Sequence, residues 1–525
     1  MLSNSSRQRD ALLTASLQQR ESKFIFILLL LFLALLGVLA DRILQAPFWS
    51  FNGTRLAPSF GLVHGYRLYY PPADGPVLST IYGPVTALVY LAATLASSPN
   101  PAVLIGSGIT VLFCFVPVAW LHLGKGRWRC AEHPTHWLAL AACGLMMVDT
   151  EALRYSCINP HADGIGLGLG AAACICLYYG RGKGHSLALP ISALLAVLSF
   201  WAKQTFLPLP FALALYVLLA DGRGIFLQYA SWGMLWSVVT AVGFFSKFGF
   251  WPVWFNLVVV PAGQVLHFSA KTFPMIEAFR QLIREGFPFL IPLLTYALYA
   301  LVRFGYDWRE LRPWLRRNNW AMLAIVGLAL TPASVMGRAK IGGDINSLSF
   351  ALYFYCIACT MMLARVATDM EHVALATFRS LARAFLVAIA IVMALAQGEV
   401  AFGIVHTIRS LRTSEQQVVF EYLLDHPNTV YFPMFPLSHL LAEGKLYHDK
   451  TGLLDREFAG YPLSPEHLRS YVPPGMEYIA FGQEGALWVK GRNMMVYFPE
   501  FRTETSLPEL AGWTIYTNQA SVGSR

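Results

Sequence analysis

Apolar and polar positions divide the chain into long apolar runs separated by short polar segments, followed by a final stretch of ordinary globular composition. The apolar runs, each roughly 17–22 residues long, recur between residues 24 and 405. A helix of that length crosses about 30 Å of hydrocarbon, and it pairs its own backbone groups where no water can do so. The pattern predicts an α-helical polytopic membrane protein with about 11–13 transmembrane helices.

Most of the boundaries of these spans can be read from the polar segments between them. The expected spans are 24–40, 102–123, 134–150, 163–180, 186–202, 205–220, 227–246, 287–304, 319–335, 346–366 and 379–404. Residues 81–97 form a further apolar run, but the whole of 81–123 lacks Lys, Arg, Asp and Glu. We expect 81–97 to be re-entrant or interfacial, because a second crossing there would reverse the orientation of the spans that follow.

From residue 406 the pattern changes to short apolar runs bounded by Pro, Gly and Asn, alternating with polar helical stretches. Runs such as "TVYFP", "EYIAFG", "MMVYFP" and "WTIYT" are typical of strands. We therefore expect a tail at 1–23, a transmembrane domain at 24–405 with long outer loops at 41–80 and 247–286, and a small α/β domain at 406–525.

Composition and charge agree with this division and give it an orientation. With 56% hydrophobic and only 13% charged residues, the chain does not fit a soluble multidomain protein. Lys and Arg gather in the tail and in alternate loops, which predicts a cytoplasmic N-terminus and an extracytoplasmic C-terminal domain. The first apolar run lacks a small-x-small cleavage site, so we interpret it as an uncleaved span. Of the eight cysteines none follows Cys359, which excludes a disulfide framework in the C-terminal domain.

Polar residues stand out where outer segments meet the spans. "SFWAKQTFLPL" sets Lys and Gln between two apolar runs, and "ALRYSCINPHADGIG" and "GRAKIGGDINS" bring further charges to the same level. A single interfacial lysine often only anchors its helix. Several cations at one depth instead suit the phosphate of a phosphorylated lipid. The candidate binding residues are Arg154, Asp163, Lys203, Gln204, Arg338, Lys340 and Asn346.

Two carboxylates near the outer ends of spans are candidates for a catalytic base or a metal ligand. Asp41 closes the first span, and Asp74 lies in the turn "PPADGP". Both tasks need an ionised oxygen at a cation-rich site, and both residues also have ordinary explanations, as a helix end and a turn residue. A divalent cation, Mg²⁺ or Mn²⁺, is left open, and no metal-ligand spacing is visible around His439, His448, Asp449 and Asp455.

The loop at 247–286 contains "FPMIEAFRQLIREG", an amphipathic stretch with aromatic and basic residues. It is expected to lie along the interface, either as a plain interfacial helix or as a lid for a lipid tail.

These segments together resemble the GT-C superfamily of integral-membrane glycosyltransferases, which use polyprenyl-phosphate-linked sugars. The resemblance covers about residues 24–350 and rests on "HGYRLYYPPADGPVLSTIYGPVTALVY", "NPHADGIGLGLG", "SFWAKQTFLPL" and "GGDINSLSF", in this order. One departure concerns the outer-loop acid of that superfamily. Near "FWSFNGTRLAPSF", where that acid is expected, this chain has Asn52 and Arg55.

The resemblance implies a glycosyltransferase that moves a sugar from a polyprenyl phosphate to a lipid, glycan or protein acceptor at the outer face of a bacterial inner membrane. In this hypothesis Arg154, Lys203, Arg338 and Lys340 bind the phosphate, and Asp41 or Asp74 is the base. Asp163, Gln204 and Asn346 would bind sugar hydroxyls, and no nucleic acid is involved. Two alternatives stay open: a flippase or transporter of an anionic lipid, and an assembly subunit that keeps the fold without activity.

Overall fold

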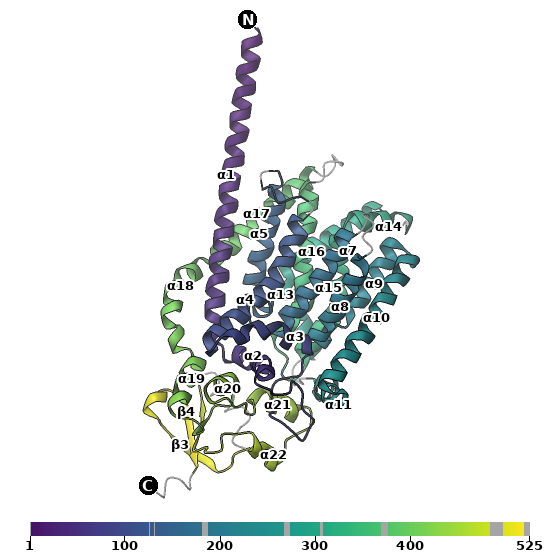
Figure 1. Cartoon of the computed structure of the whole chain (residues 1–525). Coiled ribbons are helices and arrows are strands. Elements are labelled where there is room, and N and C mark those ends of the chain that lie inside the picture. The colour runs from purple at the N-terminus through teal and green to yellow at the C-terminus, as the bar shows by residue number, and fades with distance from the viewer. Residues whose placement is uncertain are drawn as a thin grey trace.

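A computed structural model describes residues 2–518, apart from 125, 131, 181–186, 267–273, 305–307, 369–375 and 483–496. Long helices form a bundle, and a smaller domain lies at one end of it (Figure 1). The long helices of the bundle are α1 (Leu2–Gln45), α4 (Pro99–Leu123), α5 (Pro134–Asp149), α7 (Ala162–Gly180), α8 (Ala188–Ala202), α9 (Pro208–Asp221), α10 (Arg223–Phe248), α13 (Pro274–Phe304), α15 (Trp320–Ala339), α16 (Ser349–Thr368) and α17 (Ala376–Ala396).

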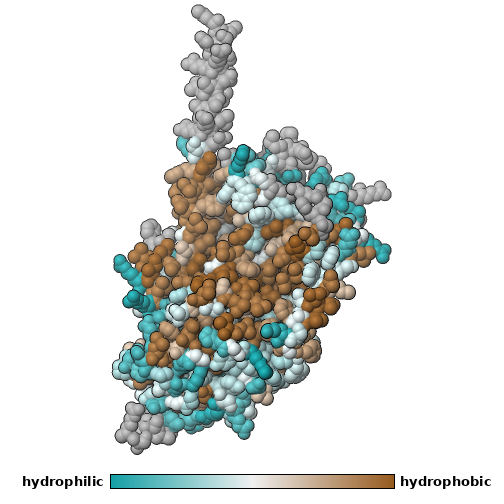
Figure 2. Space-filling view, viewed as in Figure 1, coloured by the Kyte–Doolittle hydropathy of each residue, from teal (hydrophilic) through white to brown (hydrophobic). Residues whose placement is uncertain are grey.

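Each apolar run that was predicted to be a span forms a helix of this bundle, which confirms the polytopic helical fold. Eight helices in the described part of the chain are long and apolar enough to cross a membrane. On the face shown in Figure 2, apolar side chains form a belt across the middle of the molecule, and polar side chains gather toward both ends. The chain is a multi-pass integral membrane protein.

The segment at 81–97 forms two short helical pieces, α3 (Pro84–Val89) and the 3-10 helix η2 (Tyr90–Leu95). Together they cover 12 residues from Pro84 to Leu95. At 1.5 Å per residue, they would extend only about 18 Å as an α-helix, which is short of the hydrocarbon thickness.

Three segments differ from the prediction. The outer loop 41–80 contains a helix, α2 (Ser50–Val63), which is mostly buried and packs against α20 (Pro436–Glu443) of the C-terminal domain. The amphipathic stretch at 274–286 is the first part of α13 and is continuous with the span, so no separate interfacial helix forms there. The predicted span 379–404 is broken at Gln397, after which α18 (Gly398–Ser410) packs against α1. Gln397 donates a hydrogen bond to Asp149 at 2.8 Å, which fixes the break.

Short helices connect the bundle to the smaller domain and cover its surface. They are α6 (Glu151–Ile158), α11 (Phe250–Trp254), the π-helix η4 (Phe255–Val259), α12 (Val260–Gly263), η5 (Ile345–Leu348), α19 (Glu415–Asp425), α21 (Lys450–Phe458) and α22 (Pro465–Ser470). A further short helix, α14 (Trp308–Arg317), lies at the opposite end of the bundle (Figure 1).

The C-terminal domain is a four-stranded sheet with helices, as the α/β pattern predicts. The strands are β1 (Val430–Tyr431), β2 (Tyr478–Phe481), β3 (Phe501–Thr505) and β4 (Thr514–Asn518), in the order β1-β2-β4-β3. β1 is parallel to β2, and the other pairs are antiparallel. β3 was not predicted, because its alternating residues "FRTET" are mostly polar. The first half of "MMVYFP" lies outside the described residues, as do Lys125, Arg181, Lys183 and Lys271.

Candidate active site

A buried carboxylate forms the centre of the candidate site. Asp163 is fully buried, and its Oδ1 accepts a hydrogen bond from Lys203 Nζ at 2.5 Å. Its Oδ2 accepts from Asn346 Nδ2 at 2.6 Å and lies 2.8 Å from His161 Nδ1. Ser156 Oγ donates weakly to the same oxygen at 3.4 Å. Three separate polar segments of the sequence thus meet at one carboxylate.

Local structure explains why these side chains point inward. Asp163 lies in the first turn of α7, where the helix dipole favours a negative charge. Lys203 ends α8 in an extended conformation, with φ −151° and ψ 126°, just before Pro208 begins α9. Asn346 lies in η5, which Asp344 caps by accepting a hydrogen bond from Ile345 N. Each side chain is therefore held at a helix end.

Aromatic rings surround the ammonium group of Lys203. Nζ lies 5.0 Å from the centre of the Tyr82 ring and 4.8 Å from that of Phe350. Tyr82 also packs edge-on against His161, with 5.2 Å between ring centres. The lysine itself is only 7% exposed. Its sequence pattern was that of an interfacial lysine, and in the structure it is buried next to Asp163.

A second cation, Arg55, lies beside this cluster. It donates a hydrogen bond to Tyr155 Oη at 2.7 Å, and its guanidinium carbon is 4.6 Å from the centre of the Trp49 ring. Tyr155 in turn packs against His161, with 6.1 Å between ring centres. Arg55 Nη1 is buried and has no hydrogen-bond partner. Such a donor is ready to bind an anion, because leaving it unsatisfied costs free energy.

Arg55 was not among the predicted site residues. The aromatic stretch "FWSFNGTR" signalled it, since an arginine so close to Trp and Phe can stack on their rings. Asn52, at the position of the missing acid, is buried and donates to Ala46 O and to Asn159 Oδ1. It supports the local fold and offers no carboxylate.

The structure does not bring the two predicted bases into this cluster. Asp41 is buried between α1 and α18, where it accepts hydrogen bonds from Gln45 at 2.6 Å and Thr407 at 3.3 Å. The break after α17 turns α18 back along α1 and encloses it. Asp74 accepts from Gly75 N at 2.8 Å and from Tyr471 at 3.4 Å in an exposed turn. Their contacts are structural ones, and neither carboxylate bonds to Lys203 or to the residues around it.

Three predicted cations also have other contacts. Arg338 donates to Gln281 and to the Gly343 carbonyl, and Lys340 donates to the Pro261 carbonyl at 2.6 Å. Arg154 interacts electrostatically with Arg42 of α1. None of the three bonds to the Asp163 cluster.

Gln204 has a positioning role in the structure. Its Nε2 donates to Ile81 O at 3.0 Å and to Leu257 O at 3.3 Å, and so holds two loops beside Lys203. Its Oε1 is buried without a partner and is available to a ligand.

One carboxylate of the C-terminal domain lies close to the cluster. Asp455 of α21 accepts hydrogen bonds from Ser79 at 3.3 Å and from Gln264 at 3.0 Å. It interacts electrostatically with Tyr82, the ring that contacts Lys203. Burial raises the pKa of Asp455 to about 7, because little water is left to solvate its charge.

No three His, Cys, Asp or Glu side chains gather closely enough to hold a metal ion in the described ranges. His439 contacts Glu443 and the Phe432 backbone, and His448 contacts Val77 N and His467 O. Both histidines hold the C-terminal domain together. The divalent cation left open by the sequence has no ligand set among these residues.

Comparison with known proteins shows similarity in structure alone. No protein-family model matches the sequence, and no curated protein resembles it significantly. ArnT from Cupriavidus metallidurans bound to undecaprenyl phosphate has a TM-score of 0.55 with 12% identity, over 95% of this chain and 98% of that one. Its apo structure has a TM-score of 0.52 with 11% identity, over 95% and 99%. The oligosaccharyltransferase AglB from Archaeoglobus fulgidus, in complex with an inhibitory peptide and a dolichol-phosphate, has a TM-score of 0.45 with 13% identity, over 93% and 74%.

Proposed function

We propose that this chain, which has the GT-C fold expected from its sequence, transfers a sugar from a polyprenyl-phosphate donor to an acceptor. The observation that carries the proposal is a pair of cations, the buried Lys203 and the partly buried Arg55, beside one carboxylate at the end of the bundle next to the C-terminal domain. The likeness to ArnT, whose structure was determined with undecaprenyl phosphate, supports the same class of ligand. The basic loops at the other end support an extracytoplasmic site.

The donor phosphate would bind between Lys203 and Arg55. Lys203 has three ammonium hydrogens and gives one to Asp163, which leaves two for phosphate oxygens. Arg55 offers its unpartnered Nη1. One carboxylate cannot neutralise both cations, so an anion is favoured there. Asp163 thus acts as a positioning residue for Lys203 instead of a direct sugar ligand.

In the transfer step, an acceptor oxygen or nitrogen forms a bond to the anomeric carbon of the sugar. The bond from that carbon to the phosphate oxygen breaks, and its electron pair stays on the phosphate. Lys203 and Arg55 stabilise this growing negative charge, which is electrostatic catalysis of the leaving group. Gln204 Oε1 is placed to accept a hydrogen bond from a sugar hydroxyl.

Asp455 is the proposed base for the acceptor proton. A base works best when its pKa is near the working pH, and the pKa of Asp455 is about 7. Asp41 is enclosed by two hydrogen-bonding side chains, and Asp74 lies in a separate turn. Asp455 is instead electrostatically coupled to Tyr82, which contacts Lys203. Asp455 would take up the acceptor proton and then release it to water.

The test is sugar transfer by the full-length protein in proteoliposomes, with radiolabelled polyprenyl-phosphate sugars and a cell-envelope extract as acceptor. D455N should reduce transfer at least tenfold, whereas D74N should leave it within about twofold. Asp74 is the control, because it lies in an exposed turn outside the cluster. Transfer that is unchanged in D455N would remove the proposed base. Movement of the labelled lipid across the bilayer without transfer would favour the flippase alternative.

A further inference from the structure

The end of the bundle opposite the C-terminal domain contains a cavity of about 260 Å³. The helices α4, α7, α14 and α16 end around it, and α5 and α15 begin there. Tyr178 in the last turn of α7 lines the cavity, whereas Asp163 lies in the first turn of the same helix. Fifteen residues of helix separate them, or about 22 Å. The cavity is therefore separate from the candidate active site.

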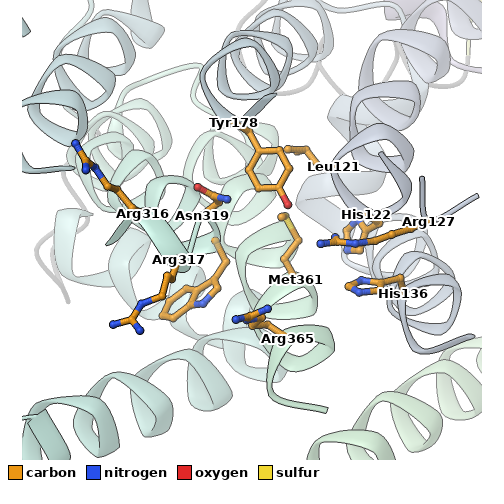
Figure 3. A pocket seen from close by; sticks show the side chains of 11 residues that line it. Leu121, His122, Arg127, His136, Tyr178, Arg316, Arg317, Asn319, Met361 and Arg365 are labelled. Carbon is orange, nitrogen blue, oxygen red and sulfur yellow. The ribbon is translucent and has the colours of Figure 1, made fainter. Parts of the chain in front are cut away.

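The cavity wall is strongly basic. Figure 3 shows Arg127 and His136 on one side, Arg316 and Arg317 on the other, and Arg365 between them. None of the eleven lining residues is acidic; they are Leu121, His122, Arg127, His136, Tyr178, Arg316, Arg317, Asn319, Trp320, Met361 and Arg365. Four arginines thus line the cavity without a carboxylate among the lining residues.

Two of the basic side chains already have protein partners. Arg316 Nε donates to the Ala220 carbonyl at 2.8 Å and lies 3.4 Å from Asp221, and its guanidinium points away from the others in Figure 3. His122 contacts Val118 O at 2.9 Å and Thr360 Oγ1 at 3.0 Å, so both of its ring nitrogens have protein partners. Of the other arginines, Arg127 and Arg317 lie on opposite sides of the cavity (Figure 3).

Aromatic side chains place this end of the bundle at the depth of the lipid headgroups. Trp120 and Trp128 are about half exposed and pack edge-on with 6.0 Å between ring centres, and Trp120 also contacts Tyr179. Exposed Trp and Tyr at the ends of apolar helices form the aromatic belt of membrane proteins. Basic pockets between helices at this depth bind phosphate-bearing headgroups.

We propose that this cavity binds a phosphate group, with Arg127 and Arg317 as its main ligands. The volume suits a small charged group, since it is below the range of about 300–1,000 Å³ for sites that bind drug-sized molecules. The phosphate belongs either to the headgroup of an anionic lipid or to a soluble phosphate compound. This site does not depend on the proposed sugar transfer.

The experiment measures thermal unfolding of the full-length protein in micelles of a neutral detergent with phosphatidylcholine. Phosphatidylglycerol is titrated in one series, and inorganic phosphate at constant ionic strength in another. The test variant is R127Q/R317Q. The matched control is R409Q/R412Q, which loses the same charge from exposed positions at the end of α18 and beyond it.

A lipid headgroup site predicts that phosphatidylglycerol stabilises the wild type and the control with one half-saturating fraction. That fraction should rise at least fivefold in R127Q/R317Q, and inorganic phosphate should have no effect. A saturable shift with inorganic phosphate that needs Arg127 and Arg317 would assign the site to soluble phosphates. Equal responses of all three proteins in both series would overturn the proposal. If R127Q/R317Q does not fold, R127Q alone is compared with R409Q under the same criteria.

Discussion

Removing the charge of Lys203 is the substitution whose cost follows most directly from the structure. The Lys203 side chain is 9% exposed and that of Asp163 is 0% exposed, and the two atoms that carry the charges are 2.5 Å apart. In Lys203→Met, Asp163 keeps Asn346 and His161 as partners but loses its ammonium group. Removing one partner of a buried ion pair typically costs about 3–5 kcal/mol, because the other charge stays buried. We expect K203M to unfold several degrees below the wild type.

The double variant K203M/D163N separates stability from function. It leaves no buried charge at this position, so it should recover most of the stability that K203M loses. It should not recover sugar transfer, because the phosphate still lacks an ammonium partner. A lost charged hydrogen bond of about 1.5–3 kcal/mol corresponds to a loss of about 10–150-fold in kcat/KM.

The assay pairs thermal unfolding, followed by tryptophan fluorescence, with initial transfer rates in the same detergent. Asp74→Asn is the control for effects of substitution and purification as such, since Asp74 lies in an exposed turn. Equal unfolding temperatures for K203M and the double variant would show that burying Asp163 without Lys203 costs no stability. Full activity in the double variant would refute the role of the ammonium group in binding the phosphate.

Three further predictions concern neighbouring residues. Burial raises the pKa of Asp455 to about 7 from an ordinary value near 4, so its ionisation costs stability above neutral pH and costs none at pH 3. Relative to the wild type, D455N should gain in unfolding temperature between pH 5 and 8. It should also lose the rise of activity through pH 7. Gly83→Ala should reduce both stability and transfer, because a Cβ atom there would collide with the Trp201 carbonyl. Gly65→Ala is the control for adding a methyl group, because a Cβ atom at Gly65 meets open space, although the φ of +84° adds some strain. Arg55→Lys should raise KM for the donor about tenfold, because a lysine cannot reproduce the planar stack on Trp49 together with the hydrogen bond to Tyr155. An unchanged KM would show that Arg55 does not contact the donor.

The helical bundle could be predicted because each span has a simple apolar pattern. Lys203, Asp163 and Asn346 could be selected because each is a polar residue at the end of an apolar helix, where burial demands a partner. Which of them pair depends on how the helices pack, and no local pattern contains that information. The lysine therefore appeared to be an interfacial residue, although it is buried against Asp163.

The surroundings of the carboxylates likewise depend on how the helices pack. Asp41 was expected to face the outer site, but α18 turns back along α1 after Gln397 and encloses it. Asp455 was passed over because its sequence surroundings are those of an ordinary polar turn. Its proximity to Tyr82 arises only when α21 packs on the loop containing Ser79.

Binding of undecaprenyl phosphate to the full-length protein in nanodiscs tests the central claim most directly. We predict saturable binding to the wild type and to D74N, and at least tenfold weaker binding to K203M/D163N, which has lost the cation and keeps a neutral core. Equal affinity in all three proteins would contradict the claim that Lys203 holds the lipid phosphate.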